Sequence, residues 1–384
     1  MTLDAGKLLD LARRETGLAD FGDETLPARF GLAVDLLNAQ GLDSAGEAAA
    51  ARNCLWLLTS RLQFFEDLKR HPIEQEAIER PIFATGEGRS GTTFLHALLS
   101  VDPNGRALRF WELMYPSPPP GLAAPNDPRR AQADDDWREI NARLPGWLPM
   151  HPYNDMLGQG IPECERTWAF DFRALTPTAW WRVPTPMQVG KLPTDQSAQY
   201  RLHKLMLQTC QYNRPKKYWV LKGFHQLRMR KLFETYPDAR VIWTHRDPVQ
   251  VIASTIMLSG NLDEMLAGGV DWDALAQQFI AGVGAGLDQV LADPIIDDPR
   301  IHHVRYADLV TDPIATLRTF YDKYAIPFGE KTEAAMRGYM AENRSDRHGK
   351  FRYSTDVLKT DIAALHDRFA PYRQRFGLEV EQRH

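Results

Sequence analysis

Apolar residues recur at helical spacing throughout the first part of the chain. Leu8, Leu11 and Ala12 repeat in this way, and the stretch GEAAAARNCLWLLTSRLQFFEDLKR carries the longest such pattern, without a proline. These patterns predict that residues 1–80 are helical. We expect them to form an N-terminal helical extension that packs on the core of the protein.

The pattern changes at Pro81, where short apolar runs begin to alternate with helical patterns. Four runs have the composition of buried strands: Ile82–Ala84, Tyr218–Lys222, Ala239–His245 and Arg300–Tyr306. The helical patterns that follow them span residues 94–99, Gln226–Tyr236, Pro248–Leu258 and Pro313–Tyr324. Strands and helices that alternate at these lengths predict an α/β fold whose parallel sheet is flanked by helices.

The remaining segments set the expected domain boundaries. The proline-rich stretch from Pro116 to Pro128 is expected to be a loop. The chain is expected to be helical again after a polar stretch at residues 341–353. We therefore expect one α/β domain over residues 81–384, into which residues 115–215 are inserted.

Composition and charge argue against several classes of protein. The formal net charge of -4 gives no strong attraction to nucleic acid. We find no run of about 18 apolar residues that would predict a membrane span, and the chain start is too charged for a signal peptide. Cys54, Cys164 and Cys210 have the spacing of neither a disulfide framework nor a zinc site. We expect a cytoplasmic protein without nucleic-acid partners; its oligomeric state stays open, a homodimer included.

The stretch PIFATGEGRSGTTFLHALL, Pro81 to Leu99, places a glycine-rich turn between a predicted strand and a predicted helix. Such a turn points backbone N–H groups at an anion, and the helix N-terminus adds partial positive charge. Gly86, Gly88 and Gly91 match the dinucleotide pattern G-x-G-x-x-G, while Gly86 and Gly91 also match the G-x-x-x-x-G of nucleotide triphosphatases. The turn therefore predicts a phosphate site whose ligand has to be identified from other residues.

Two nucleotide ligands fit this turn poorly. A dinucleotide site needs an acidic residue about 20 positions further on, and Glu112 leads into prolines instead of a crossover. An ATP or GTP site needs a lysine where Thr92 stands, and a magnesium-binding aspartate after a later strand. Asp247 precedes Pro248, so we expect it to cap a helix instead. Arg89, by contrast, offers a permanent charge and a fork of donors suited to phosphate and sulfate oxygens.

With Arg89 at this place, the turn resembles that of the nucleotide-dependent sulfotransferases, in the bacterial branch that reads G-x-x-R-[ST]-G-T-T-x-L-x-x-L-L. The resemblance covers roughly Pro81 to Phe328. It implies a P-loop nucleotide-kinase-like fold and transfer of a sulfuryl group from 3′-phosphoadenosine 5′-phosphosulfate, a co-substrate used without a metal, to a small-molecule hydroxyl acceptor. The residues that the resemblance assigns to the 5′-phosphosulfate are Arg89, Ser90, Gly91, Thr92 and Thr93.

Further segments resemble the nucleotide site of the same family. HRDPVQVIAS supplies Arg246 and Ser254, which the resemblance assigns to the 3′-phosphate, and two helical turns return the serine to the side of the strand end. VRYADLVTDPIATLRTFYDKYAIPF places Tyr306 near the adenine. RSDRHGKFRYS matches the C-terminal nucleotide loop loosely, with an ordinary polar loop as the alternative. Its candidate donor-binding residues are Arg347, Gly349 and Lys350.

Sulfuryl transfer requires stabilised charge, an acceptor in line and a base. The resemblance places Lys222 beside the donor's bridging oxygen, and we expect Arg89 and the N–H groups of the turn to stabilise the charge. His225 is the first candidate for the base, because its place resembles that of the branch's histidine and the unperturbed pKa of histidine suits proton transfer. Glu163 and Glu165, in GIPECERTW, are its rivals, since an aromatic-lined pocket would raise the pKa of a carboxylate.

Residues 115–215, the insertion expected on the acceptor side, are rich in tryptophan. The tryptophans are Trp137, Trp147, Trp168, Trp180 and Trp181. They suit the wall of a pocket for an apolar or aromatic acceptor, and equally a packed core. Two other functions stay open: a P-loop kinase that uses ATP and magnesium, against which Thr92 argues, and a non-catalytic nucleotide-binding scaffold.

Overall fold

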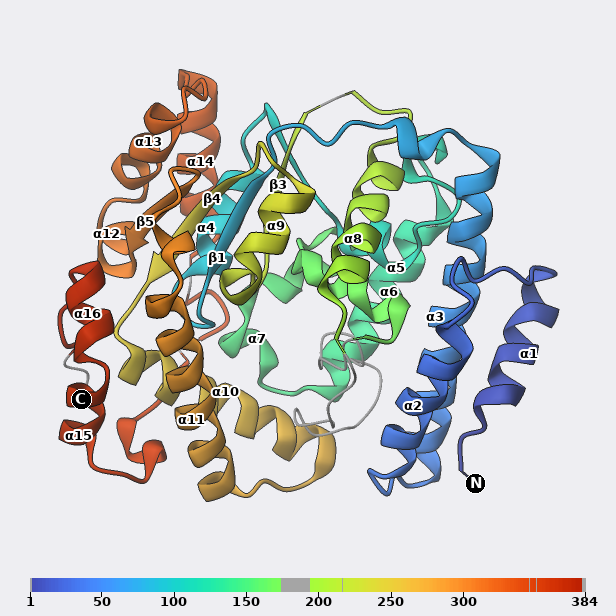
Figure 1. The fold of residues 1–384 in the computed structure, drawn as a ribbon, viewed down its shortest axis with the longest axis horizontal. Helices are drawn as coiled ribbons and strands as arrows, with labels where there is room; N and C mark the ends of the chain where they lie inside the picture. The colour runs from blue at the N-terminus through green and yellow to red at the C-terminus, as the bar shows by residue number, and fades with distance from the viewer. Residues whose placement is uncertain (1, 174–193, 216, 345, 350, 382–384) are drawn as a thin grey trace.

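A five-stranded sheet in the order β2-β3-β1-β4-β5 lies at the centre of the computed structural model (Figure 1). Each neighbouring pair is parallel, which confirms the predicted α/β fold with a parallel sheet. The strands are β1 Ile82–Gly86, β2 Gly105–Ala107, β3 Tyr218–Lys222, β4 Arg240–His245 and β5 Ile301–Arg305. The residues described are 2–173, 194–215, 217–344, 346–349 and 351–381.

Alternate residues of the strands face two different helix layers, because successive side chains of a strand point to opposite sides. Ile82 and Ile242 pack in one apolar cluster with α4, α13 and α14. Phe83 and Trp243 pack in a second, larger cluster with α8, α9 and α11. The bounds are α4 Thr92–Ser100, α8 Gln196–Gln211, α9 Met229–Thr235, α11 Trp272–Ala292, α13 Pro313–Lys323 and α14 Glu330–Glu342.

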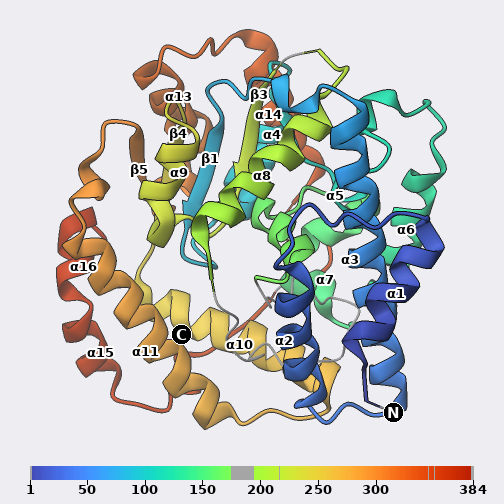
Figure 2. The same ribbon diagram turned by 45° about the vertical axis from the view of Figure 1, so that its right-hand side comes forward.

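The N-terminal helices lie together on the side of the molecule away from β5 (Figures 1 and 2). They are α1 Ala5–Thr16, α2 Leu26–Asn38 and α3 Ser44–Arg70, so the predicted helical character of this region is confirmed. Their apolar faces belong to the same cluster as Phe83. The rings of Phe30, on α2, and Phe172 lie 4.8 Å apart within it. This contact joins α2 to the part of the chain around residue 172.

Several helices and 3-10 turns lie between β2 and residue 171. They are α5 Phe110–Met114, η2 Pro120–Leu122, α6 Pro128–Arg143, α7 Trp147–Met150, η3 Pro152–Gln159 and η4 Cys164–Asp171, where η marks a 3-10 helix. The loop expected at Pro116–Pro128 therefore contains one 3-10 turn. It ends where Asp127 caps α6 and Pro128 occupies the first turn of that helix.

The second half of the chain follows the predicted alternation, but α11 and α14 were not predicted and several predicted elements have other bounds. Asp247 caps helix α10 and Pro248 lies in its first turn, as predicted, but α10 runs from Pro248 to Ala267 because its left-handed cap is Gly268. Tyr306, predicted to end a strand, begins helix α12 instead. The other elements are η1 Ile73–Gln75, η5 Gln226–Arg228, η6 Pro294–Asp297, α12 Tyr306–Thr311, η7 Thr355–Leu358, α15 Ile362–Arg368 and α16 Ala370–Phe376.

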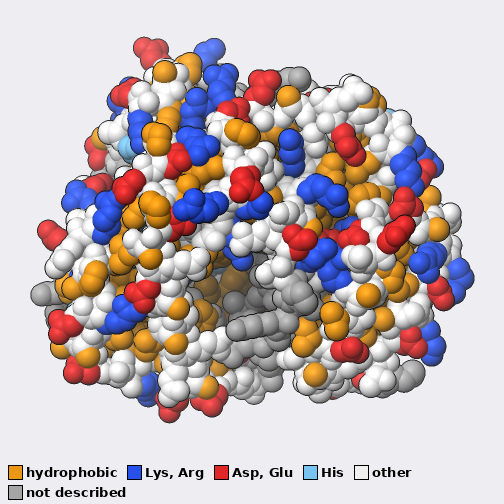
Figure 3. All heavy atoms as spheres, in the orientation of Figure 1, with side chains coloured by type: hydrophobic (Ala, Val, Ile, Leu, Met, Phe, Trp, Pro, Cys, Tyr) orange, Lys and Arg blue, Asp and Glu red, His pale blue; other side chains and the backbone are white. Residues whose placement is uncertain are grey.

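Basic and acidic side chains are interspersed over the face of the molecule that Figure 3 shows. This mixture agrees with a formal net charge of only -4 over the whole chain. Within the described ranges, every helix is too short or too polar to cross a membrane.

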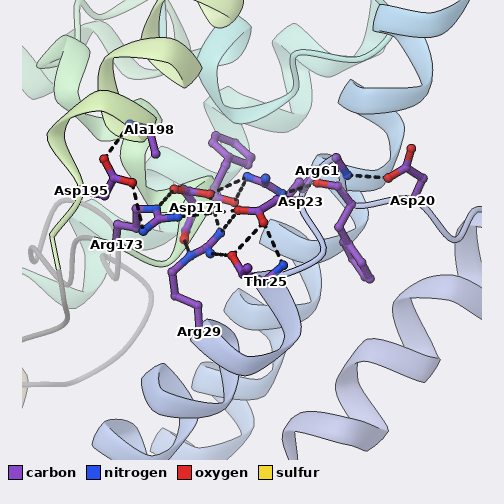
Figure 4. A network of polar contacts seen from close by, with 12 residues as sticks. Asp20, Asp23, Thr25, Arg29, Arg61, Asp171, Arg173, Asp195 and Ala198 are labelled. Atoms are coloured by element: carbon purple, nitrogen blue, oxygen red, sulfur yellow. Dashed lines mark hydrogen bonds and ion pairs between the residues drawn. The ribbon is translucent and has the colours of Figure 1, made fainter.

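A network of ion pairs joins the N-terminal helices to the end of η4 (Figure 4). The Asp171 carboxylate accepts from Nη2 of Arg29 at 2.7 Å and from Nε of Arg173 at 2.5 Å, and it lies 3.1 Å from Nη1 of Arg61. Asp23 binds Arg29 as well, at 2.9 Å. Burial lowers the pKa of Arg61 to about 10, so its guanidinium is charged at neutral pH. The network thus ties α2 and α3 to η4 through buried charges.

We predict that Asp171→Ala lowers the free energy of unfolding by about 3–5 kcal/mol, because it leaves buried guanidinium groups without their counter-charge. Asp10→Ala is the control, since it removes a solvent-exposed ion pair with Arg13 and is expected to cost less than about 1 kcal/mol. Urea unfolding at neutral pH, followed by circular dichroism, measures both losses. An effect of Asp171→Ala as small as that of the control would contradict a stabilising role for the network.

Candidate functional site

The glycine-rich turn between β1 and α4 has a backbone that favours glycine at Gly86 and Gly91. Their φ angles are +144° and +89°, which residues with a Cβ rarely adopt. At Gly91 a Cβ would also lie 2.9 Å from the Tyr306 ring. Arg89 is left-handed too, with a φ of +66°. The turn leads into the N-terminus of α4, where unpaired backbone N–H groups form an anion site.

The side chain of Arg89 reaches across to helix α10. Its Nε donates to Ser254 Oγ at 3.0 Å, and its Nη1 donates to the Met150 carbonyl at 3.2 Å. The guanidinium carbon lies 5.1 Å from the centre of the Phe351 ring. Burial lowers the pKa of Arg89, and the charge of Arg246 lowers it further. Arg89 and Ser254 therefore touch, although the resemblance assigns them to opposite ends of one ligand.

Arg246 stands just after β4, beside the same turn. Its Nη1 donates to the Arg89 carbonyl at 2.9 Å, and its Nη2 donates to the Tyr353 hydroxyl at 3.0 Å. The Tyr306 ring faces it, with 4.3 Å between the guanidinium carbon and the ring centre. The Glu381 carboxylate accepts from both Nε and Nη2 at 2.8 Å. Four contacts from separate parts of the chain thus fix the orientation of Arg246.

These side chains line a cavity of about 860 Å³, a volume that suits a nucleotide-sized ligand. Ser90, which the resemblance places with them, is instead fully buried, and its hydroxyl donates to the Glu87 carbonyl at 2.6 Å. Its side chain therefore braces the turn from within. The predicted donor-binding residues that do line the cavity are Arg89, Gly91, Thr92, Thr93, Arg246, Ser254 and Tyr306.

The loop at residues 344–354, predicted to bind the nucleotide, uses Arg347 for an ion pair within the protein. Nε and Nη2 of Arg347 donate to the two Asp155 carboxylate oxygens, at 2.7 and 3.0 Å, and Arg347 thereby fastens the segment that forms one cavity wall. Gly349 has a φ of +99°, and Lys350 lies outside the described residues.

Two aromatic residues of this loop, Phe351 and Tyr353, line the cavity as well, and neither was predicted from the sequence. The two aromatic residues in the stretch KFRYS could have indicated this role from the sequence. Glu381, which binds Arg246, was also missed, and we find no signal in the sequence that could have indicated it.

Lys222, at the end of β3, joins the glycine-rich turn to the segment before η4. Its Nζ donates to Thr93 Oγ1 at 3.1 Å and to Glu163 Oε1 at 2.5 Å. The second Glu163 oxygen accepts from Nε of Arg166 at 2.9 Å. Burial would raise the pKa of Glu163, but the charges of Lys222 and Arg166 hold it well below its usual range. Glu163 is therefore an ionised partner of two cations and a weak base.

Glu165 and His225 lie close to each other but differ in their hydrogen bonds and in the direction of their pKa shifts. His225 is fully buried, with Nδ1 2.7 Å from the Tyr200 hydroxyl and Nε2 3.2 Å from Cys164 Sγ. Burial lowers the pKa of His225 well below its usual value, whereas burial raises the pKa of Glu165 to about 6. In the part of the chain that is described, the buried Oε2 of Glu165 has no hydrogen-bond partner. Such an oxygen is a buried acceptor that no described group satisfies.

Of the described tryptophans of the inserted segment, two are buried in the core and one stacks on a residue of the cavity wall. Trp137 and Trp168 are buried in the apolar core. Trp147 stacks on His151, with 5.4 Å between the ring centres, and His151 lines the cavity. Trp180 and Trp181 lie outside the described residues.

Comparison with known proteins assigns most of the chain to one family. Residues 81–330 match the model described as the sulfotransferase family. The chain is 26% identical over 315 residues to a Mycobacterium bovis protein named omega-hydroxy-beta-dihydromenaquinone-9 sulfotransferase Stf3. The match covers 78% of this chain and 75% of that protein, and the Mycobacterium tuberculosis protein of the same name matches equally.

Two solved structures resemble the whole chain. Sulfotransferase STF9 from Mycobacterium avium has a TM-score of 0.82 and 28% identity, with 100% of this chain and 99% of that chain covered. Sulfotransferase STF1 from Mycobacterium tuberculosis has a TM-score of 0.76 and 26% identity, with coverage of 96% and 99%. The fold that the sequence resemblance implied is thereby confirmed.

We predict that Gly91→Ala lowers the free energy of unfolding by about 1–2 kcal/mol through its left-handed backbone, and by more through its contact with Tyr306. Gly88→Ala is the matched control in the same turn, because a Cβ there meets only ordinary contacts, 3.6 Å or more away. We expect the control to stay within about 0.5 kcal/mol. Urea unfolding of both variants measures the difference, and equal losses would contradict the constraint at Gly91.

Proposed function

The chain belongs to the sulfotransferase family, and from that premise we propose that it moves a sulfuryl group from 3′-phosphoadenosine 5′-phosphosulfate to a hydroxyl of a small apolar acceptor. The observation that carries the donor assignment is one cavity lined by Arg89, Arg246, Ser254 and the first residues of α4. Two guanidinium groups and a helix N-terminus suit a ligand with two separate anionic groups. Membership of the family also argues against the kinase and scaffold alternatives.

The two anionic ends of the donor are assigned to different groups of cavity residues. We place the 5′-phosphosulfate at the N-terminus of α4, where Thr92, Thr93 and Arg89 offer N–H and O–H donors. We place the 3′-phosphate at Arg246 and Ser254. We assign the nucleoside to the Tyr306 ring and to the loop that contains Arg347, Gly349 and Lys350. Because a sulfuryl group carries less charge than a γ-phosphate, these cations suffice and we propose no metal ion.

In the proposed step, the acceptor oxygen bonds to sulfur while the bond between sulfur and the bridging phosphate oxygen breaks. The electron pair of the broken bond stays on the phosphate oxygen. Lys222, whose Nζ lies 3.1 Å from the Thr93 hydroxyl, and the N–H groups of the turn stabilise that developing charge. The hydroxyl proton passes to a protein base, and the products are a sulfate ester and 3′-phosphoadenosine 5′-phosphate.

We propose Glu165 as the base, in preference to His225 and Glu163. Burial raises the pKa of Glu165 to about 6, and its buried Oε2 has no partner among the described residues, so it combines useful basicity with an acceptor oxygen that no described group occupies. Glu163 is held ionised by Lys222 and Arg166. Both ring nitrogens of His225 are engaged inside the protein, which favours a supporting role.

An apolar acceptor is supported by the surface beside Glu165. Phe224 and Leu227, which follow β3, are large hydrophobic side chains with exposed fractions of 44% and 39%. Gly223 precedes these residues and lies next to the base: a Cβ on Gly223 would lie 3.4 Å from the Glu165 carboxyl carbon. The residues that form the surface therefore follow, along the chain, a position that is close to Glu165. The named acceptor of the Mycobacterium bovis relative is a hydroxylated menaquinone derivative. We propose an acceptor of that general class, a hydroxyl carried by an apolar framework.

We predict that 3′-phosphoadenosine 5′-phosphate, the desulfated donor, binds in the micromolar range without magnesium, and that ATP and NAD bind far more weakly. Arg246→Ala should weaken this binding about tenfold to a hundredfold, since it removes charge-assisted hydrogen bonds. Arg305→Ala is the control: it removes an exposed ion pair with Asp308 and should leave the affinity unchanged. Isothermal titration calorimetry measures all three proteins. A preference for ATP with magnesium would mean that the donor assignment is wrong.

We predict that Glu165→Gln lowers kcat by roughly 10²–10⁴-fold, the usual contribution of a general base. In the wild-type enzyme, kcat/KM should fall about tenfold per pH unit below about pH 6, because the carboxylate has to be ionised to accept the proton and its pKa is about 6. Steady-state rates measured between acidic and neutral pH test this. Affinity for 3′-phosphoadenosine 5′-phosphate serves as the control for folding. A larger loss in His225→Asn, with that affinity intact, would return the role of base to His225.

A further inference from the structure

The last described residues of the chain return to the donor cavity at Arg246. Glu381 accepts the Nε and Nη2 hydrogens of that arginine, each at 2.8 Å, in the fork geometry of arginine–carboxylate pairs. Its backbone is fixed as well, since its N–H donates to Asp247 Oδ2 at 3.0 Å and its carbonyl accepts from Gln250 Nε2 at 3.1 Å. Glu381 is therefore fastened to the first turn of α10, beside the residues assigned to the 3′-phosphate.

Glu381 approaches Arg246 from outside the cavity. Arg246, Tyr306 and Tyr353 line the cavity, and Glu381 is missing from the described residues that do so. The Glu381 side chain keeps 26% of its surface exposed, whereas that of Arg246 keeps only 4%. The carboxylate thus contacts the guanidinium without lining the described cavity itself.

The hydrogen bonds of Arg246 indicate what this contact does. A guanidinium has five N–H groups, of which two donate to Glu381, one to the Arg89 carbonyl and one to the Tyr353 hydroxyl. The two bonds to Glu381 hold the plane of the guanidinium against rotation. The carboxylate also offsets the repulsion between Arg246 and Arg89, whose charges lie close enough to lower the pKa of Arg89.

We propose that Glu381 is a positioning residue for recognition of the donor's 3′-phosphate, an inference that rests on the proposed function. It fixes the Arg246 guanidinium so that the fifth N–H, on Nη1, to which no described residue is bonded, is directed to the phosphate. The 5′-phosphosulfate is bound at α4 and Arg89, so it does not depend on this contact. Glu381 therefore acts selectively on the group that distinguishes this donor from adenosine 5′-phosphosulfate.

Calorimetric titration of the full chain with 3′-phosphoadenosine 5′-phosphate and with adenosine 5′-phosphate tests this, because the two ligands differ only in the 3′-phosphate. Glu381→Gln keeps the side-chain size but turns an amide NH₂ toward the donors of Arg246. We expect it to weaken binding of the first ligand about tenfold to a hundredfold, and of the second less than about twofold. Glu379→Gln is the matched control: it removes the same charge from an exposed position two residues earlier and should change neither affinity.

Tighter binding of 3′-phosphoadenosine 5′-phosphate to Glu381→Gln would overturn the inference, because the carboxylate would then be a competitor of the phosphate. Equal losses for both ligands would also overturn it, since they would indicate general support of the fold. If the wild-type protein discriminates between the ligands and Glu381→Gln discriminates equally well, the inference alone fails. If the wild-type protein binds both ligands equally, the proposed donor itself is wrong.

Discussion

The organisation of the site depends on holding two like charges, Arg89 and Arg246, at one cavity wall. The parallel sheet brings them together, because β1 and β4 are neighbours and their carboxyl ends meet at one edge. Their repulsion is met by acceptors from several elements: Ser254 Oγ and the Met150 carbonyl for Arg89, and the Arg89 carbonyl and Glu381 for Arg246. The left-handed backbone at Arg89 and Gly91 belongs to the same arrangement.

The acidic residues at the other side of the site illustrate how neighbouring identical groups acquire different chemistry. Glu163 and Glu165 are two positions apart, yet Glu163 lies between two cations while one oxygen of Glu165 has no partner in the described chain. The pKa of the first is depressed and that of the second is raised to about 6. Both glutamates belong to the segment that the ion pairs of Asp171 with Arg29 and Arg61 tie to α2 and α3.

Local patterns predicted the parts of the protein that local physics determines. The limits of the strand Tyr218–Lys222, the cap at Asp247 and the meeting of Arg246 with Ser254 at one cavity follow from spacing and turn chemistry. The role of Ser90 as an internal brace did not follow, because it depends on contacts with another strand. Glu381 lies 135 positions from Arg246, and no periodic pattern joins such distant partners. The difference between Glu163 and Glu165 is likewise a property of surroundings, not of sequence.

The position of Lys222 has a thermodynamic consequence. Its ammonium group touches Thr93 of the donor turn and Glu163 of the segment on the opposite side, so one cation is shared by both halves of the site. An occupant of either half that draws this cation toward itself changes the free energy of the other half. Linkage requires that coupling to be reciprocal. Under the proposed function, donor and acceptor affinities would then be coupled, with a positive or negative sign, and two separate binding constants would not describe them.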